Sequence, residues 1–318
     1  MINRRRMIRS TEEKYSSKYF TIESLEDGNV VSIKNVSCDT LPVFYYSTND
    51  GQTWDSITAE KSKTKAVVTI NNGSKVLFKC TQASLSVAWN YYNCFQCSKN
   101  YIVYGNVMSL IWGDSFISNN EFASNTCANL VALFRDDTHI INASNLILPA
   151  LTIPGQGYNG MFRGCSNLRK APKLPATTFL KYTGTTTGGN YSSMFEGCIN
   201  LEKAPDLPAT TLEVECYQRM FCMNRNSRIT TPKMTKSPVL SAAIVPEKAY
   251  NDMFKGNGNL AEVTCLATNI SASNAVQNWL TNTSLTGTFY KAASMTSWPR
   301  SGNNGIPSQW EVYDYVGT

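Results

Sequence analysis

Hydrophobic and small residues return at fixed spacing along the middle of the chain. The stretch that starts at Tyr158 reads YNGMFRGCSNLRKAPKLPATT, and the stretch from Tyr191 reads YSSMFEGCINLEKAPDLPATT. Shorter versions start at Tyr217 and Tyr250, and a degenerate earlier version covers residues 129–150. The Met residue of each Met-Phe pair is separated from the next by 33, 26 and 33 residues. This period predicts an array of stacked repeats, each of which buries its apolar face against a neighbour.

The residue types within one unit predict its local structure. Tyr, Met and Phe at positions one, four and five form one apolar stripe, which favours a short helix ended by Gly. The Leu-x-x-Ala-Pro-x-Leu-Pro segment is expected to be extended, because proline cannot continue a helix. A small residue follows each Met by four positions and is expected to bond the backbone of the bend; these residues are Cys165, Cys198, Asn224 and Asn257. The charged residues that differ between units are expected to face solvent; these are Arg163, Glu196, Lys255, Lys173 and Asp206.

Residues 19–112 have the period-two alternation of β-strands. KAVVTI and KVLFKC flank NNGS, which predicts a hairpin. We therefore expect a small antiparallel β-sandwich of about five to eight strands. The segment STNDGQTW, from Ser47 to Trp54, resembles the Asp-box of sialidases with Asn49 in the Asp place. We interpret it as a capped β-turn against which Trp54 packs.

The C-terminal residues predict a cover for the open end of the array. SASNAVQNWL begins with Ser271, a helix cap, and has Val276, Trp279 and Leu280 at helical spacing. A Pro- and Trp-rich segment follows, and repeat arrays need atypical terminal caps. The expected fold class is mixed β with short helices. The expected parts are a basic tail (1–18), the sandwich (19–112), the repeats (113–270) and the cap (271–318).

Composition excludes some classes of protein. The 318 residues are 42% hydrophobic and 16% charged, which is typical of an ordered chain. No apolar run approaches the ~18 residues that a membrane-spanning helix needs. The start, MINRRRMIRS, has no apolar segment after its basic cluster, so we expect no secretory signal and no membrane insertion.

The net charge of +6 is concentrated near the N-terminus. The residues responsible are Arg4, Arg5, Arg6 and Arg9. A solvated tail, a docking peptide for an acidic protein surface and a nucleic-acid contact are three interpretations. Because no aromatic residues alternate with the arginines, we expect no nucleic-acid partner and assign the cluster as an anchor to other proteins.

The potential ligands and nucleophiles do not form a recognisable site. A single histidine, His139, excludes a multi-histidine metal centre, and Cys94 and Cys97 have no second pair at zinc-site spacing. We expect reduced, buried cysteines and no metal or cofactor. The acidic clusters are expected in solvated turns, so we predict no catalytic residues and no enzyme; they are Glu23, Glu26, Asp27, Asp136 and Asp137.

The motif MFxGCxxLxxAPxLPATT resembles the BspA-like, or Treponema-type, leucine-rich repeats of Bacteroides proteins. It is especially similar to versions from Bacteroides phages, including crAss-like phages, which also have openings similar to residues 19–33 and endings similar to residues 287–312. The resemblance implies a leucine-rich-repeat solenoid used for display or binding, without catalytic residues. Residues 222–248 depart from the motif, which puts the regularity of the third unit in doubt.

The resemblance implies a non-enzymatic phage virion protein: a head fibre, a capsid decoration or a tail-associated protein. Its implied partners are capsid or other virion proteins through the N-terminus, and a host-surface glycan or protein through the repeats. A homo-oligomer would multiply weak affinity. The alternatives are a bacterial surface adhesin, a cytoplasmic protein-binding scaffold and, third, a glycan hydrolase, which would need paired carboxylates in a cleft.

The candidate ligand loop is a ten-residue segment that contains the seven-residue expansion of one repeat. It reads KYTGTTTGGN, from Lys181, and insertions in repeats often emerge on the binding face. The alternative is a Gly/Thr loop without a ligand. The candidate ligand residues are Tyr182, Thr185, Thr186, Thr187 and Asn190.

Overall fold

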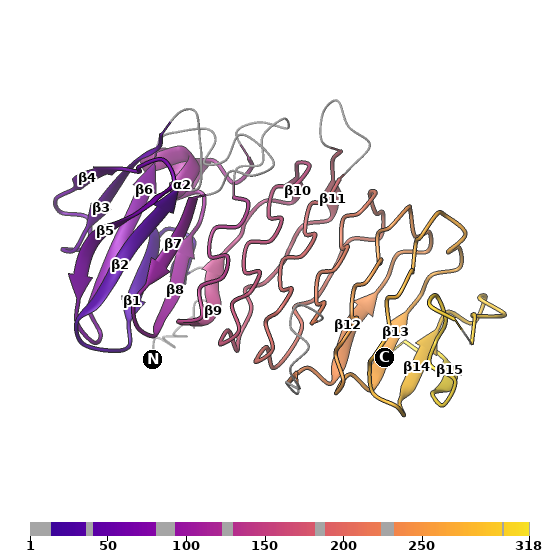
Figure 1. Ribbon diagram of the computed structural model, residues 1–318. Coiled ribbons are helices and arrows are strands. Elements are labelled where there is room, and N and C mark those ends of the chain that lie inside the picture. Colours follow the sequence, from indigo (N-terminus) through magenta and orange to yellow (C-terminus); the bar gives the residue numbers. More distant parts are fainter. Residues whose placement is uncertain are drawn as a thin grey trace, which may run out of the picture.

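The protein, studied as a computed structural model, is an elongated, mostly β molecule (Figure 1). The structure describes residues 14–35, 41–80, 93–122, 130–181, 188–223, 232–300 and 302–317. Two packed sheets form the N-terminal end, and a β-solenoid of about six turns continues from them toward the C-terminus. The prediction of a mostly β chain with a repeat solenoid is therefore confirmed.

The N-terminal end contains a six-stranded sheet in the order β4-β3-β6-β1-β8-β9 and a three-stranded sheet in the order β5-β2-β7. The first sheet comprises β1 (Phe20–Ser24), β3 (Val43–Ser47), β4 (Asp55–Thr58), β6 (Lys75–Cys80), β8 (Tyr101–Asn106) and β9 (Ile140–Ile147). The second comprises β2 (Asn29–Asn35), β5 (Lys63–Ile70) and β7 (Asn93–Cys97). Helix α2 (Ser109–Trp112) and the 3₁₀ helix η1 (Gly113–Ser118) follow β8.

Aromatic side chains join these two sheets. Phe95 of β7 lies with its ring centroid 4.8 Å from that of Phe78 and 5.1 Å from that of Phe20, both in the first sheet. All three rings are buried. Their burial removes a large apolar area from water, which is the main stabilising contribution here.

The predicted hairpin around NNGS is wrong, because its two strands join different sheets. β5 pairs with β2, whereas β6 pairs with β1 and β3. The turn instead docks on Ser24, whose backbone nitrogen donates to Ser74 and whose carbonyl accepts from Gly73. The pairing of β5 with β2 and of β6 with β1 thus replaces the β5–β6 pairing that the turn residues favour.

The first sheet continues directly into the solenoid. β9 pairs with β8 in parallel, and Tyr101 lies opposite Ile140. In the first turn, Phe134 packs with its centroid 5.9 Å from Phe20 and 6.5 Å from Phe95. The N-terminal sheets therefore cover the apolar end that the first turn would otherwise expose to water.

The helix expected in each repeat is wrong: the segment forms a ladder of tight turns. Within one turn of the solenoid the amide nitrogen of Arg163 donates to the Gly160 carbonyl at 3.0 Å, while that of Phe162 donates to Met194 of the next turn at 3.0 Å. Positive φ angles recur every fourth residue, at 58° for Gly160 and 79° for Gly164, and these interrupt a right-handed helix. Every second amide is thereby turned toward the neighbouring coil, which a helix could not achieve.

The predicted burial of the repeat residues is confirmed. Two columns of aromatic rings run through the core, and adjacent rings are stacked. The first column is Phe134, Phe162, Phe195, Phe221 and Phe254. The second is Tyr158, Tyr191, Tyr217, Tyr250, Trp279 and Trp298. The methionines of the motif are fully buried beside them; these are Met161, Met194, Met220 and Met253.

The small residue after each Met-Phe pair bonds the backbone, as expected. The Cys165 thiol donates to the Phe134 carbonyl at 2.9 Å, and the Cys198 thiol donates to the Phe162 carbonyl at 3.1 Å. The Asn257 amide makes the same contact with the Phe221 carbonyl. Each bond joins one coil to the coil before it, and Asn224 lies outside the described residues.

The last turns build a four-stranded parallel sheet in the order β12-β13-β14-β15. Its strands are β12 (Lys236–Leu240), β13 (Glu262–Cys265), β14 (Thr288–Lys291) and β15 (Glu311–Asp314), and a separate pair comprises β10 (Thr152–Ile153) and β11 (Thr178–Phe179). The helix expected from Ser271 is also wrong, because residues 273–282 continue the turn ladder, with φ of 55° at Asn278. Trp298 stacks on Trp279 at 5.4 Å, and both are buried at this end of the solenoid.

Candidate functional site

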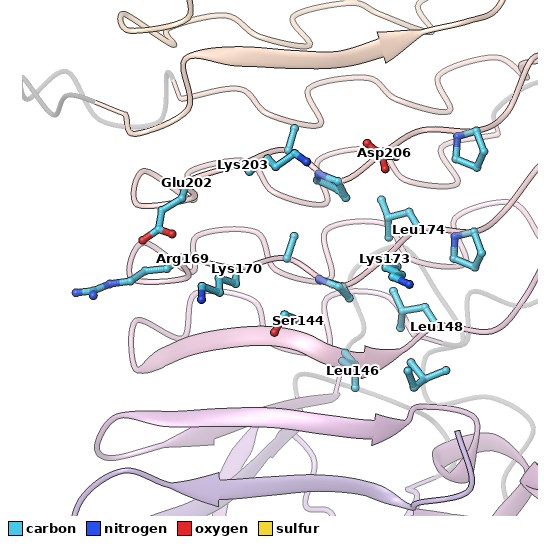
Figure 2. A pocket seen from close by; sticks show the side chains of 17 residues that line it. Ser144, Leu146, Leu148, Arg169, Lys170, Lys173, Leu174, Glu202, Lys203 and Asp206 are labelled. Carbon is cyan, nitrogen blue, oxygen red and sulfur yellow. The ribbon is translucent and has the colours of Figure 1, made fainter. Parts of the chain in front are cut away.

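A surface groove of about 550 Å³ crosses three successive turns of the solenoid (Figure 2). It lies where β9 and the two Ala-Pro-x-Leu-Pro segments run side by side. Its lining is mostly apolar, and charged side chains stand along it. The apolar lining residues are Leu146, Ile147, Leu148, Ala171, Pro172, Leu174, Pro175, Ala204, Pro205 and Pro208.

The prolines explain why a groove forms here instead of a continuous sheet. Isolated bridges pair Asn142 with Lys170 and Lys170 with Lys203, and no strand is formed over the two proline segments that follow. Pro172 and Pro205 have no amide hydrogen, so they cannot donate to a neighbouring rung. The rungs therefore lie beside one another without a full ladder, and apolar atoms remain accessible between them.

The charged residues of the groove form three rows across adjacent turns. Equivalent positions lie 33 residues apart, which places Arg169 with Glu202 and Lys173 with Asp206. These two rows combine opposite charges. The middle row differs, because Lys170 lies directly opposite Lys203, both side chains are exposed, and the described ion pairs include neither. Like charges directly across a pair of strands repel each other, so this row is unfavourable without an anion.

The two ends of the groove differ in chemistry. In Figure 2, Arg169, Lys170 and Glu202 lie toward one end, and Leu148 and Leu174 lie toward the other. The solvent exposure predicted for Lys173 and Asp206 is confirmed. Arg169 and Lys170 thus lie at one end, whereas Lys173 lies beside the aliphatic side chains at the other (Figure 2). None of the described residues that line the groove is aromatic.

Most of the ligand loop and the whole arginine cluster lie outside the described residues. These are Tyr182, Thr185, Thr186 and Thr187, together with Arg4, Arg5, Arg6 and Arg9. Asn190 is described and fully buried, and its amide donates to the carbonyls of Ile153, Pro154 and Leu180 at 2.9–3.0 Å. Asn190 therefore holds the base of the loop against the preceding turn.

Glu196 corrects the expectation that the variable charged residues all face solvent. Its side chain is 0% exposed and lies between two arginines of the adjacent turns. Arg163 approaches at 3.0 Å and Arg219 at 2.9 Å. Burial of the carboxylate is possible because both neighbouring turns supply a guanidinium.

The acidic clusters fall into two groups. Glu26 and Asp27 are exposed turn residues, and their carboxylates accept from Asn100 at 3.2 Å and Asn72 at 3.0 Å. Glu23 is half-buried on β1, and Asp136 is exposed, with Arg135 at 3.4 Å.

Asp137 is buried, which corrects the expectation of a solvated turn. Its carboxylate accepts from the amides of Cys97 at 3.0 Å and His139 at 2.8 Å, and from the Tyr101 hydroxyl at 2.9 Å. Burial raises the pKa of Asp137, against the opposing effect of these hydrogen bonds. The carboxylate joins β7 and β8 to the first turn of the solenoid. Its role at this position is therefore structural.

The Asp-box-like segment forms the expected capped turn. The Ser47 hydroxyl accepts from the Gly51 amide at 2.9 Å, and the Asn49 side chain accepts from the Thr53 amide at 3.0 Å. Trp54 packs edge-on against Tyr19, with centroids 4.9 Å apart, and under the Lys79 ammonium, 4.2 Å from its ring. The segment thus braces the edge of the first sheet.

The part of the chain that the structure describes contains no group of three or more His, Cys, Asp or Glu side chains placed to hold a metal ion. Seven cysteines whose side chains the structure describes are buried; these are Cys80, Cys97, Cys165, Cys198, Cys216, Cys222 and Cys265. None of the described helices is long and apolar enough to cross a bilayer.

Sequence reasoning missed the groove, although one signal was available. Aligning the two closest repeats shows that Lys170 and Lys203 are the pair of equivalent exposed residues with the same charge. The proline spacing, read as a sign of extended chain, also predicts an interrupted ladder. No protein-family model, curated protein or solved structure matches this chain, so its function must be argued from these contacts.

Proposed function

We propose that this chain is a non-enzymatic bacteriophage virion protein whose solenoid displays a binding face toward the host surface. The proposal includes a head fibre, a capsid decoration or a tail-associated protein. Its repeats would belong to the BspA-like leucine-rich type, and its two N-terminal sheets would form an antiparallel β-sandwich. The resemblance of the repeat motif supports this part of the proposal.

The groove is the observation that carries the binding role. Clefts of about 300–1,000 Å³ with an apolar lining and a few polar groups are typical of binding sites. The groove's volume of about 550 Å³ lies in that range, and its charged residues come from successive turns of a rigid array. A rigid surface loses little conformational freedom when it binds.

The N-terminal arginines would attach the chain to other virion proteins, and several copies would bind together. Multivalent presentation raises overall affinity without new contacts. The proposed ligand class is a host-surface protein or glycan.

Two measurements test the proposal. Particles purified from a phage lysate are analysed by mass spectrometry, and the purified chain is incubated with intact host cells in a sedimentation assay. We expect the chain in the particles and saturable binding to the cells. Finding the chain only in the envelope of uninfected cells would support an adhesin instead, and turnover of capsular polysaccharide would overturn the non-enzymatic assignment.

A further inference from the structure

We infer that the groove binds an extended peptide segment, with an acidic side chain seated between Lys170 and Lys203. This inference rests on the proposed binding function and selects protein, rather than glycan, as the ligand class. Three features of the groove support it: the like-charged row, the apolar lining and the shape.

The like-charged row supplies an anion site. Lys170 and Lys203 face each other across adjacent rungs, at the spacing of paired strands, about 4.8 Å. The flanking rows already combine Arg169 with Glu202 and Lys173 with Asp206, so their charges are balanced. The unbalanced positive charge is therefore local to the middle row. A carboxylate placed there would bond both ammonium groups and remove their repulsion.

The lining favours a peptide over a neutral sugar. Protein sites for sugars commonly combine an aromatic ring for stacking with polar or charged groups for hydrogen bonds. Among the described residues that line this groove, none is aromatic, none carries a side-chain amide, and Ser144 supplies the one hydroxyl. Aliphatic side chains of a peptide, by contrast, would contact Ala171, Pro172, Ala204 and Pro205 and lose apolar surface to solvent.

The shape of the groove favours an extended chain. It crosses three successive turns, with Arg169 and Lys170 toward one end and Leu148 and Leu174, beside Lys173, toward the other (Figure 2). In an extended peptide alternate side chains point to the same side, so an acidic residue and an apolar residue two positions away would reach both regions. The expected ligand sequence therefore alternates Asp or Glu with aliphatic residues or Pro.

The experiment uses a displayed library of random dodecapeptides. The library is selected on the full chain and counter-selected on the double variant Lys170→Glu, Lys203→Glu. We expect enriched sequences with one or two acidic residues beside aliphatic ones. A selected peptide should bind the double variant at least tenfold more weakly than the unmodified chain, because two attractive contacts become repulsive. The conservative variant Lys170→Arg, Lys203→Arg should retain binding within about threefold.

The matched control is Lys63→Glu, Lys65→Glu, which makes the same charge change on β5, far from the groove. We expect it to leave peptide binding unchanged. An equal loss in this control would show a general charge effect and overturn the inference. Failure to enrich acidic peptides would also overturn it.

Two further measurements distinguish a failure of this inference from a failure of the proposed function. Oligogalacturonate serves as the anionic saccharide probe. If the unmodified chain binds it but binds no peptide, and if Lys170→Glu, Lys203→Glu abolishes that binding, the ligand is an anionic glycan and not a peptide. Host-cell binding by the double variant at the level of the unmodified chain would overturn the groove assignment and leave the proposed function standing. All variants are first compared by thermal unfolding, and the midpoint for Lys170→Glu, Lys203→Glu should equal that of the unmodified chain because both lysines are exposed.

Discussion

Phe162 and Phe195 occupy equivalent positions 33 residues apart, and their rings lie parallel within 3° with centroids 5.6 Å apart. The same contact recurs from Phe134 to Phe254, so one column of rings passes through five turns. Each ring is buried by the turn on either side of it. Stability is therefore shared between neighbouring turns, which is the property of a stacked array.

Phe195→Ala should be strongly destabilising, because it removes a fully buried ring that contacts Phe162 and Phe221. Replacing a buried Phe by Ala costs about 3–5 kcal/mol through lost contacts and a cavity. Met194→Leu, at the neighbouring buried position, should cost less than about 1.5 kcal/mol, because it nearly conserves volume. Denaturant unfolding followed by circular dichroism measures both. Equal losses in the two variants would contradict the stacked column.

Glu196→Gln should destabilise the chain by about 1–3 kcal/mol. The substitution keeps the size of the side chain but removes the charge that Arg163 and Arg219 share. The cost stays below that of a fully buried ion pair, because the two arginines are partly exposed and water hydrates them. Glu202→Gln, an exposed carboxylate at the groove, is the control and should change stability by less than about 0.5 kcal/mol. A Glu196→Gln effect as small as that of the control would show that the charge of Glu196 between Arg163 and Arg219 contributes nothing to stability.

The seven buried cysteines should resist thiol reagents in the folded protein. Burial raises the pKa of Cys265 to about 12 and also raises the pKa values of Cys97, Cys198 and Cys216, so the reactive thiolate is scarce. Alkylation with iodoacetamide, followed by peptide mass spectrometry, should leave these thiols unmodified until denaturant is added. Rapid labelling of Cys165 or Cys198 in the native protein would mean that the turns open readily.

The repeat period was predictable from sequence because residues at equivalent positions of neighbouring turns stack on one another and are of similar type. Tyr, Met and Phe recur since each contacts its counterpart in the next turn, and this holds whether the segment is a helix or a ladder of turns. The local conformation was not predictable from spacing alone. The positive φ of 56° at Ser193 comes from bonds to the neighbouring turn, such as Ser193 to Gln218, and these are not local.

The sites were less predictable than the fold for the same reason. The sequence predicts an exposed Glu196 because its two partners lie in other repeats. It predicts a local hairpin at residues 71–74, although the two flanking strands pair elsewhere. The groove depends on where prolines from two repeats meet. Each of these errors therefore concerns a contact between segments far apart in the sequence, whereas the features predicted correctly lie within one repeat or are copied in every repeat.

The buried carboxyl of Asp137 should make stability fall as pH rises. Burial raises its native pKa above the ordinary 3.8, so the folded state binds this proton more tightly than the unfolded state. Between 3.8 and the raised value the folded chain holds more protons, and the free energy of unfolding decreases with increasing pH in that window. Asp114 has a lowered pKa, through hydrogen bonds from Lys79 and Tyr19, and acts in the opposite direction at lower pH.

Asp137→Asn isolates this contribution from that of the other carboxyls. The free energy of unfolding of the unmodified chain, minus that of the variant, should decline as pH rises above the ordinary pKa of 3.8, because only the unmodified chain carries the titrating group. Asp136→Asn, which removes an exposed carboxyl one residue away, is measured in parallel as the control. Denaturant titrations at each pH supply the values. A difference for Asp137→Asn that rises with pH would mean that the hydrogen bonds from Cys97, Tyr101 and His139 outweigh burial, and that the carboxylate is held ionised in the core.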